Sequence, residues 1–169
     1  MEAPGRNAKG GRSTQDKEMN QIDAPPEKGR IEAAKEMITR GRIHLELGKS
    51  VDALMYFERA LELDPNNSIA WAARGVAMVN LCRYDDAIDS FDKAILLDAE
   101  LPFAWEGKAV ALHKQGKHEA AVPFFEMALN LNQDFARAWW GLAEALEAAG
   151  RADEARLCRE RAKELNGEK

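Results

Sequence analysis

The sequence has few of the residues that hold small secreted domains together or that attract anionic ligands. Its 169 residues include only two cysteines, Cys82 and Cys158, too few and too far apart for a disulfide framework or a zinc knuckle. The formal net charge is −5, so no general cationic surface is available for nucleic acids or anionic membranes. No apolar run approaches a membrane span, and residues 1–20 lack a signal-peptide core. We therefore expect a cytoplasmic protein.

The sequence also lacks the constellations that carry catalysis. Neither the G-x-x-x-x-G-K-[ST] nor the G-x-G-x-x-G motif occurs. His113 and His118 flank Gly116, but no Cys or close carboxylate pair completes a metal set, which favours two solvent-exposed histidines. The acidic pair Asp85-Asp86 is expected at a helix start, where it complements the helix dipole. We predict no catalytic, cofactor-binding or metal site, and hence a protein that is not an enzyme.

The N-terminal segment differs in composition from the rest of the chain. Residues 1–28 hold Gly, Pro, Ser, Asn and Gln with balanced charge, and their only large apolar residues are Met1, Met19 and Ile22. Such a segment buries too little apolar surface to offset the entropy lost on ordering. We predict a disordered tail over residues 1–28 and one domain over residues 29–169.

That domain repeats itself every 34 residues. The stretches "AWAARGVAM", "AWEGKAVAL" and "AWWGLAEAL" begin at Ala70, Ala104 and Ala138. From residue 34 onward the sequence can be written in four rows, 34–67, 68–101, 102–135 and 136–169. Three columns of these rows are Met37, Trp71, Trp105, Trp139; Gly41, Gly75, Ala109, Ala143; and Phe57, Phe91, Phe125, Arg159. The period predicts a stack of similar supersecondary units.

Each row reads as a hairpin of two helices. Apolar residues recur at helical spacing in two blocks, with a short polar break between them. Gly48 and Gly116 stand in two of these breaks, where a left-handed helix cap is wanted, and Pro65 stops the second helix of the first row. A short hairpin cannot bury its own apolar face, but a stack of hairpins can. We expect eight helices, with small residues of the Gly41 column at close helix approaches and the tryptophans buried between layers.

A 34-residue hairpin with W-x2-L-G-x2-Y, then A-x3-F, then A and P, resembles the tetratricopeptide repeat family over residues 34–169. The resemblance implies an all-α fold, an α-solenoid of four tandem helical hairpins in a right-handed superhelical stack. Arg40, Arg74 and Lys108 depart from the family's Leu, but their stems can lie on the core with the charges in solvent. Arg159 in the Phe column and a polar outer face mark the final helix as a cap.

The resemblance also implies that the first helix of each hairpin lines a concave groove. Trp140 directly follows Trp139, and a helix turns about 100° per residue, so the two indoles cannot share one face. Trp139 stands in the same column as Trp71 and Trp105, which we expect to be buried. Trp140 is therefore expected to face the groove. The predicted binding residues are Ile38, Arg42, Ile69, Val76, Val79, Phe103, Val110, Arg137, Trp140 and Glu144.

One binding mode of the family is tested by residue identity. Domains that clamp a chaperone's C-terminal carboxylate carry Lys and Asn on the first helix, Asn on the next, and Lys and Arg on the third. The matching residues here are Ile38 and Arg42, then Ala73, then Phe103 and Gly107. The register one repeat later fits no better, so we predict no chaperone carboxylate clamp.

Two functions follow. The leading hypothesis is a non-enzymatic scaffold or adaptor whose groove binds an amphipathic helix or apolar peptide of another protein, because exposed apolar patches mark binding sites. The alternative is a self-assembling structural scaffold that forms homo-oligomers through the groove or the first repeat. Nucleic acids, membranes and cofactors are not expected partners in either case.

Overall fold

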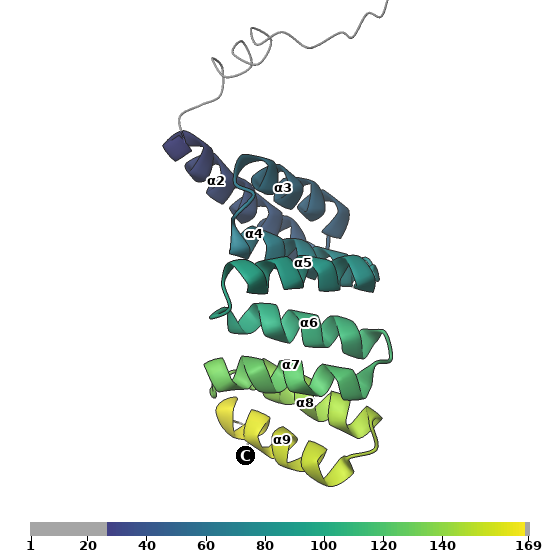
Figure 1. Ribbon diagram of the computed structural model, residues 1–169. Coiled ribbons are helices and arrows are strands. Elements are labelled where there is room, and N and C mark those ends of the chain that lie inside the picture. The colour runs from purple at the N-terminus through teal and green to yellow at the C-terminus, as the bar shows by residue number, and fades with distance from the viewer. Residues whose placement is uncertain (1–26, 168–169) are drawn as a thin grey trace, which may run out of the picture.

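The computed structural model describes residues 27–167, and this part of the chain is all-helical, with eight helices and no strand (Figure 1). Of the predicted disordered tail, residues 1–26 lie outside the described residues, while Glu27 and Lys28 already belong to the first helix that the structure describes. The helices are α2 (Glu27–Glu46), α3 (Ser50–Leu63), α4 (Ser68–Asn80), α5 (Tyr84–Leu97), α6 (Pro102–Lys114), α7 (His118–Leu131), α8 (Ala136–Ala148) and α9 (Ala152–Leu165).

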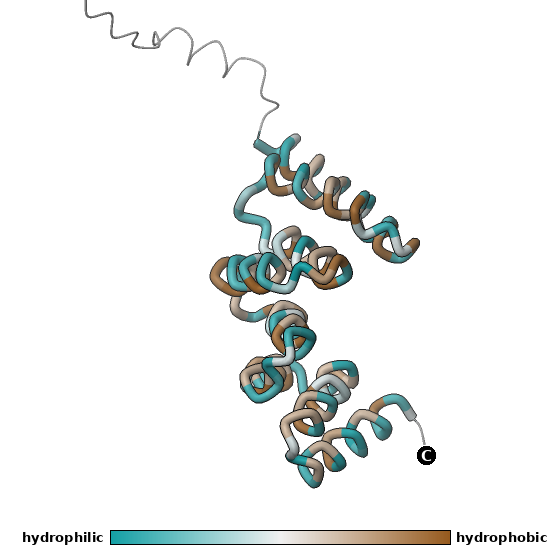
Figure 2. The backbone as a smooth tube through the Cα atoms, turned by 90° about the vertical axis from the view of Figure 1, so that its right-hand side faces the viewer, coloured by the Kyte–Doolittle hydropathy of each residue, from teal (hydrophilic) through white to brown (hydrophobic). Residues whose placement is uncertain are grey.

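The helices form four antiparallel hairpins stacked along one axis, from α2 and α3 at one end to α8 and α9 at the other (Figure 1). Helices α4, α6 and α8 begin at Ser68, Pro102 and Ala136, each 34 residues after the last, which confirms the period read from the sequence. The first helix is the exception, because α2 begins at Glu27 and runs for 20 residues. Apolar and polar residues alternate along the helices (Figure 2), as expected of elements that bury one part of their surface.

The turns within the hairpins share one backbone geometry. Gly48, Gly116 and Gly150 have φ values of 71°, 81° and 84°, so the left-handed caps expected at Gly48 and Gly116 are confirmed. After each cap, the next backbone N–H returns to the carbonyl five residues earlier, as when Lys49 donates to His44 at 2.8 Å. The second repeat has Cys82 at this position, with φ 57°. A non-glycine residue there is strained.

The centre of the stack is a row of phenylalanines held between small residues. Phe57, Phe91 and Phe125 are at most 1% exposed. Gly75 faces Phe91 within its own hairpin, as expected for the Gly41 column. Gly107, in the next hairpin, lies against the same ring. The close approaches therefore occur between repeats as well as within them.

The tryptophan stripe corrects one expectation, because Trp71, Trp105 and Trp139 are partly buried rather than buried. Each indole Nε1–H donates to a backbone carbonyl six residues earlier, that of Pro65, Ala99 or Gln133, at 2.8–2.9 Å. The indole N–H needs a partner. It finds one in the turn that enters the repeat, which lies near the surface, and the ring therefore stays at the edge of the layer.

Both ends of the stack carry charged residues at positions that are apolar inside it. Glu36 takes the place held by the buried Ala70, Ala104 and Ala138, and it pairs with Arg40 at 2.5 Å. At the other end, Arg159 replaces the phenylalanine and pairs with Glu147. These substitutions end the apolar core, as the sequence predicted for the last helix. None of the helices between residues 27 and 167 is long and apolar enough to cross a membrane.

Candidate binding groove

The first helices α4, α6 and α8 enclose a hollow of about 290 Å³, called the groove pocket below. It is lined by Val76, Val79 and Asn80 of α4, Phe91 of α5, Glu106, Gly107 and Val110 of α6, and Arg137, Trp140, Gly141 and Glu144 of α8. Six of the ten residues predicted for the groove are among them, namely Val76, Val79, Val110, Arg137, Trp140 and Glu144. Helical spacing within each repeat and the 34-residue period between repeats bring these six together.

The other four predicted residues lie elsewhere. Ile38 is 8% exposed and belongs to the core of the first two repeats, so its assignment to the groove is corrected. Phe103 is partly buried and packs on the same core. Arg42 is exposed and Ile69 is 50% exposed, but neither lines the groove pocket.

The burial of Ile38 has a simple cause in the stack. Its equivalents in the next two repeats, Ala72 and Glu106, are 0% and 5% exposed, so the following first helix covers this column. Trp140 holds the same position in the fourth repeat and is 42% exposed. Because no further first helix follows α8 within the described residues, Trp140 remains uncovered.

Trp140 and Trp139 point in different directions, as their adjacent positions on the helix require. The indole of Trp139 donates to the carbonyl of Gln133 at 2.8 Å, beside the preceding turn. The indole of Trp140 donates to Glu144 Oε1 at 3.2 Å, within the lining of the groove pocket. Trp140 therefore presents an exposed aromatic ring beside Val76 and Val110.

A buried carboxylate lies in the wall of this pocket. The Glu106 side chain is 7% exposed, and its Oε2 accepts a hydrogen bond from Arg137 Nη2 at 2.8 Å. Burial raises the pKa of the Glu106 carboxyl above its usual range, and the Arg137 guanidinium opposes this rise. Glu106 was not among the predicted groove residues. The signal that could have singled it out is that its column otherwise holds Ile38, Ala72 and Trp140.

The histidines correct a second expectation, because His113 and His118 face each other instead of standing free in solvent. Their Nδ1 atoms are 3.0 Å apart, and both side chains are partly buried. Burial lowers the pKa of His113, and the proximity of His118 lowers it further. Among the described residues, no group of three His, Cys, Asp or Glu side chains is arranged to hold a metal ion.

Four stacked helical hairpins with a concave pocket define an α-solenoid. Family models of the tetratricopeptide repeat match residues 38–103, 80–134 and 112–166, which together span most of the chain. The chain belongs to the tetratricopeptide repeat family. Modules of this family generally serve interactions between proteins.

Solved structures show the same fold at low sequence identity. TTC0263, a thermophilic TPR protein of Thermus thermophilus, has a TM-score of 0.75 and 18% identity, over 80% of this chain and 75% of that chain. MamA from Desulfovibrio magneticus RS-1 has a TM-score of 0.69 and 24% identity, over 80% and 76%.

The first TPR of Spaghetti (RPAP3), bound to an HSP90 peptide, has a TM-score of 0.68 and 21% identity, over 71% of this chain and 98% of that chain. No curated protein matches the chain in sequence. These structural likenesses describe the fold of the chain.

Proposed function

We propose that this protein is a non-enzymatic scaffold that binds an amphipathic helix or an apolar peptide of another protein in its concave groove. The observation that carries this proposal is the groove pocket with Trp140 on its wall. An indole that is 42% exposed beside Val76 and Val110 is an aromatic anchor next to an apolar floor. Arg137 and Glu144 supply a charged rim, and interface hot spots are commonly built from these parts.

The shape of the site supports a peptide or helix more than a small molecule. The groove pocket has a volume of about 290 Å³, and residues of the three first helices α4, α6 and α8 form most of its lining. A helix laid along such a face would insert one or two side chains, and its flanking residues would contact the exposed parts of the groove. The lining also contains two acidic residues, Glu106 and Glu144, and one basic residue, Arg137. A site that binds a carboxylate needs an excess of basic residues, so this composition supports our prediction that the groove is no carboxylate clamp.

The proposal is tested with a displayed library of random 16-residue peptides, selected against the full chain. We expect some of the selected peptides to bind specifically. In amide NMR spectra, these should shift residues of α4, α6 and α8 on the concave side, Trp140 among them. Peptides whose shifts map only to α3, α7 and α9 would contradict a concave binding site.

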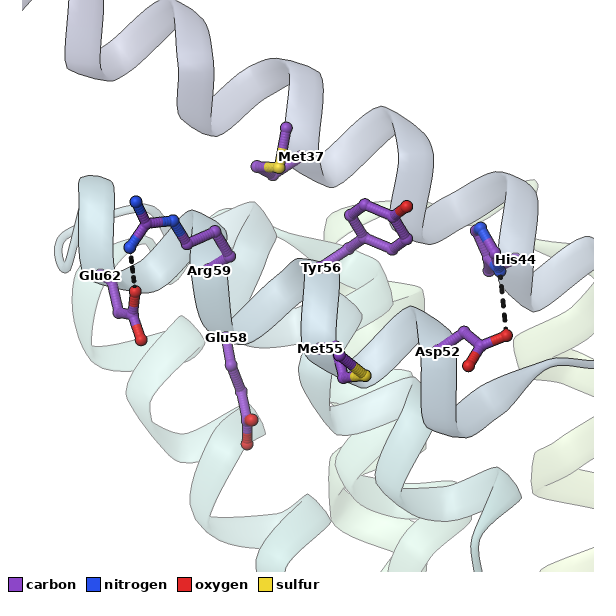
Figure 3. Close-up of a pocket in the computed structure, with 8 residues that line it drawn as sticks. All are labelled: Met37, His44, Asp52, Met55, Tyr56, Glu58, Arg59 and Glu62. Carbon is purple, nitrogen blue, oxygen red and sulfur yellow. Dashed lines mark hydrogen bonds and ion pairs between the residues drawn. The ribbon is translucent and has the colours of Figure 1, made fainter.

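A second function, self-assembly through the first repeat, is favoured by a larger pocket between α2 and α3. This first-hairpin pocket has a volume of about 720 Å³ and is lined by Met37, His44, Asp52, Met55, Tyr56, Glu58, Arg59 and Glu62. In Figure 3, Met37 and Tyr56 project into the space between the two helices, and His44 lies 3.5 Å from Asp52. Met55 is 66% exposed, so apolar surface is available for a second copy.

Light scattering across a concentration series separates the two functions. Self-assembly predicts a mass that rises with concentration, and Met55→Glu should reduce this rise. A constant monomer mass at high concentration removes the second function and leaves the first intact.

A further inference from the structure

The groove pocket contains a carboxyl group, that of Glu106, at a position that the stack otherwise fills with apolar residues. Glu106 is 5% exposed, while Ile38 and Ala72 at equivalent positions are 8% and 0% exposed. A buried carboxylate is costly unless it is paired and hydrogen-bonded. A small apolar residue at this position would be buried at a lower cost in free energy than a carboxylate. Packing alone therefore does not explain why Glu106 stands here.

The partner of this carboxylate is held only loosely. Among the described residues, Arg137 is the one side chain that hydrogen-bonds to Glu106, and it holds Oε2, which leaves Oε1 for a second donor. The Arg137 side chain is 68% exposed, and its guanidinium lies 5.3 Å from the centre of the Phe135 ring. Because its side chain is mostly in solvent, separating Arg137 from Glu106 would bury no additional charge on Arg137.

The rest of the lining suits the side chain of a lysine or arginine. Val76 and Val110 offer an apolar path for a long aliphatic stem, and Trp140 offers a ring face for a cation. Glu106 and Glu144 contribute two negative charges to the lining and Arg137 contributes one positive charge, so the pocket carries an excess of one negative charge. An acidic side chain would meet this excess at short range, where charges act strongly.

We propose that the groove pocket is a recognition site for a basic side chain, a lysine or arginine within an otherwise apolar segment of the partner, whose cation binds the Glu106 carboxylate. This inference rests on the proposed function of the groove and names the chemistry of its partner. Arg137 then occupies the carboxylate in the free protein and is the group that the partner's cation displaces or joins.

The test repeats the random-peptide selection at about pH 8, where an ordinary carboxyl group is ionised, on the full chain and on two variants. Peptides selected on the unaltered chain should be enriched in Lys or Arg beside apolar residues, and Glu106→Gln should abolish this enrichment. Glu160→Gln, which removes an exposed carboxylate on α9, is the matched control and should keep it.

Arg137→Gln gives a test of opposite sign. If Arg137 competes with the partner's cation, this variant should bind a selected Lys-containing peptide more tightly than the unaltered chain does. If Arg137 itself holds an anionic partner, binding should weaken instead, and the inference is wrong. A thermal melt of each variant verifies that the fold is retained.

One selected peptide then measures the pairing directly. Replacing its Lys by norleucine should weaken binding to the unaltered chain about tenfold, the scale of a hydrogen-bonded charge. The same replacement should change binding to Glu106→Gln less than about twofold. Concave-site peptides without Lys or Arg enrichment would overturn the inference and leave the proposed function standing. A selection that yields no peptide dependent on Trp140 would contradict both.

Discussion

Gly107 of the third repeat lies directly against the ring of Phe91 in the second repeat. A Cβ atom at Gly107 would overlap the Cε1 and Cζ atoms of this ring. A Cβ atom at Gly75, in the same hairpin as Phe91, would lie 2.8 Å from the same two atoms. Phe91 is therefore enclosed by two glycines from different hairpins, and this contact joins one repeat to the next.

The other two rings allow a sharp prediction from this contact. By register, Phe57 lies between Gly41 and Ala73, and Phe125 between Ala109 and Gly141. One alanine is thus tolerated beside each ring, because the ring can shift toward the remaining glycine. Gly75→Ala and Gly107→Ala should each cost about 1 kcal/mol of unfolding free energy.

The double variant should cost more than the sum of the two, by about 1 kcal/mol or more, because the ring then has no free side. Urea denaturation of the four proteins measures this coupling. Additive losses would mean that the two glycines do not act on one ring position.

Trp105 should stabilise the chain through two separable contributions. Its Nε1–H donates to the Ala99 carbonyl at 2.8 Å, and its ring stacks on Phe124 with the centroids 6.2 Å apart. Trp105→Phe keeps a ring and loses the hydrogen bond, which should cost about 1 kcal/mol. Trp105→Ala should cost about 3 kcal/mol, at the low end for a large aromatic residue because the ring is only partly buried.

Trp140→Ala is the control for this series. Its ring is 42% exposed, so its loss should change the unfolding free energy by less than about 1 kcal/mol. Equal losses at Trp105 and Trp140 would show that the two rings have been assigned to the wrong faces.

Replacing Cys82 by glycine should stabilise the folded chain. Its φ of 57° matches Gly48, Gly116 and Gly150 at the same turn of the other repeats. An L side chain in this conformation costs about 1–2 kcal/mol, so Cys82→Gly should raise the unfolding free energy by about 1 kcal/mol. Gly48→Ala is the reciprocal variant and should lower it by a similar amount. A Cys82→Gly variant less stable than the unaltered chain would mean that the thiol makes a contact worth more than this strain.

The buried Glu106 predicts a pH-dependent change in stability. Burial raises its pKa above the usual value of 4.5, so the folded chain favours the protonated form more than the unfolded chain does. The stabilising effect of this proton is full below the unfolded pKa and is lost as the pH rises through the folded pKa. Glu106→Gln stays neutral, so its unfolding free energy relative to the unaltered chain should rise from about pH 4 to about pH 7.

Urea denaturation at the two pH values measures this difference. A relative stability of Glu106→Gln that falls over this interval would show that the Arg137 ion pair outweighs the cost of burial.

Much of this fold is encoded in patterns that a single sequence displays. The rows written from residues 68, 102 and 136 begin where α4, α6 and α8 begin, because each repeat has the same length and no insertion shifts the register. From the sequence, we assigned Trp139 and Trp140 to different faces of their helix, because helix geometry alone separates the directions of two adjacent side chains.

The errors concern what covers a side chain. Ile38 and Trp140 occupy the same column, but α4 follows the first repeat and covers Ile38, whereas no first helix follows α8 within the described residues. Whether a position is exposed depends on its place in the stack, and periodicity alone does not include this information. The Glu106–Arg137 pair is also a contact between repeats, 31 residues apart in the sequence.

The central claim is that a partner segment binds in the groove pocket, and the affinity of a selected peptide for Trp140→Ala tests it most directly. Leu157→Ala is the matched control, because Leu157 is 60% exposed on α9 and lies outside this pocket. Titration of the peptide against the three proteins should show binding weakened about thirtyfold by Trp140→Ala, as for an interface hot spot, and unchanged by Leu157→Ala. Equal affinity for the unaltered chain and Trp140→Ala, with the fold intact, would contradict the claim.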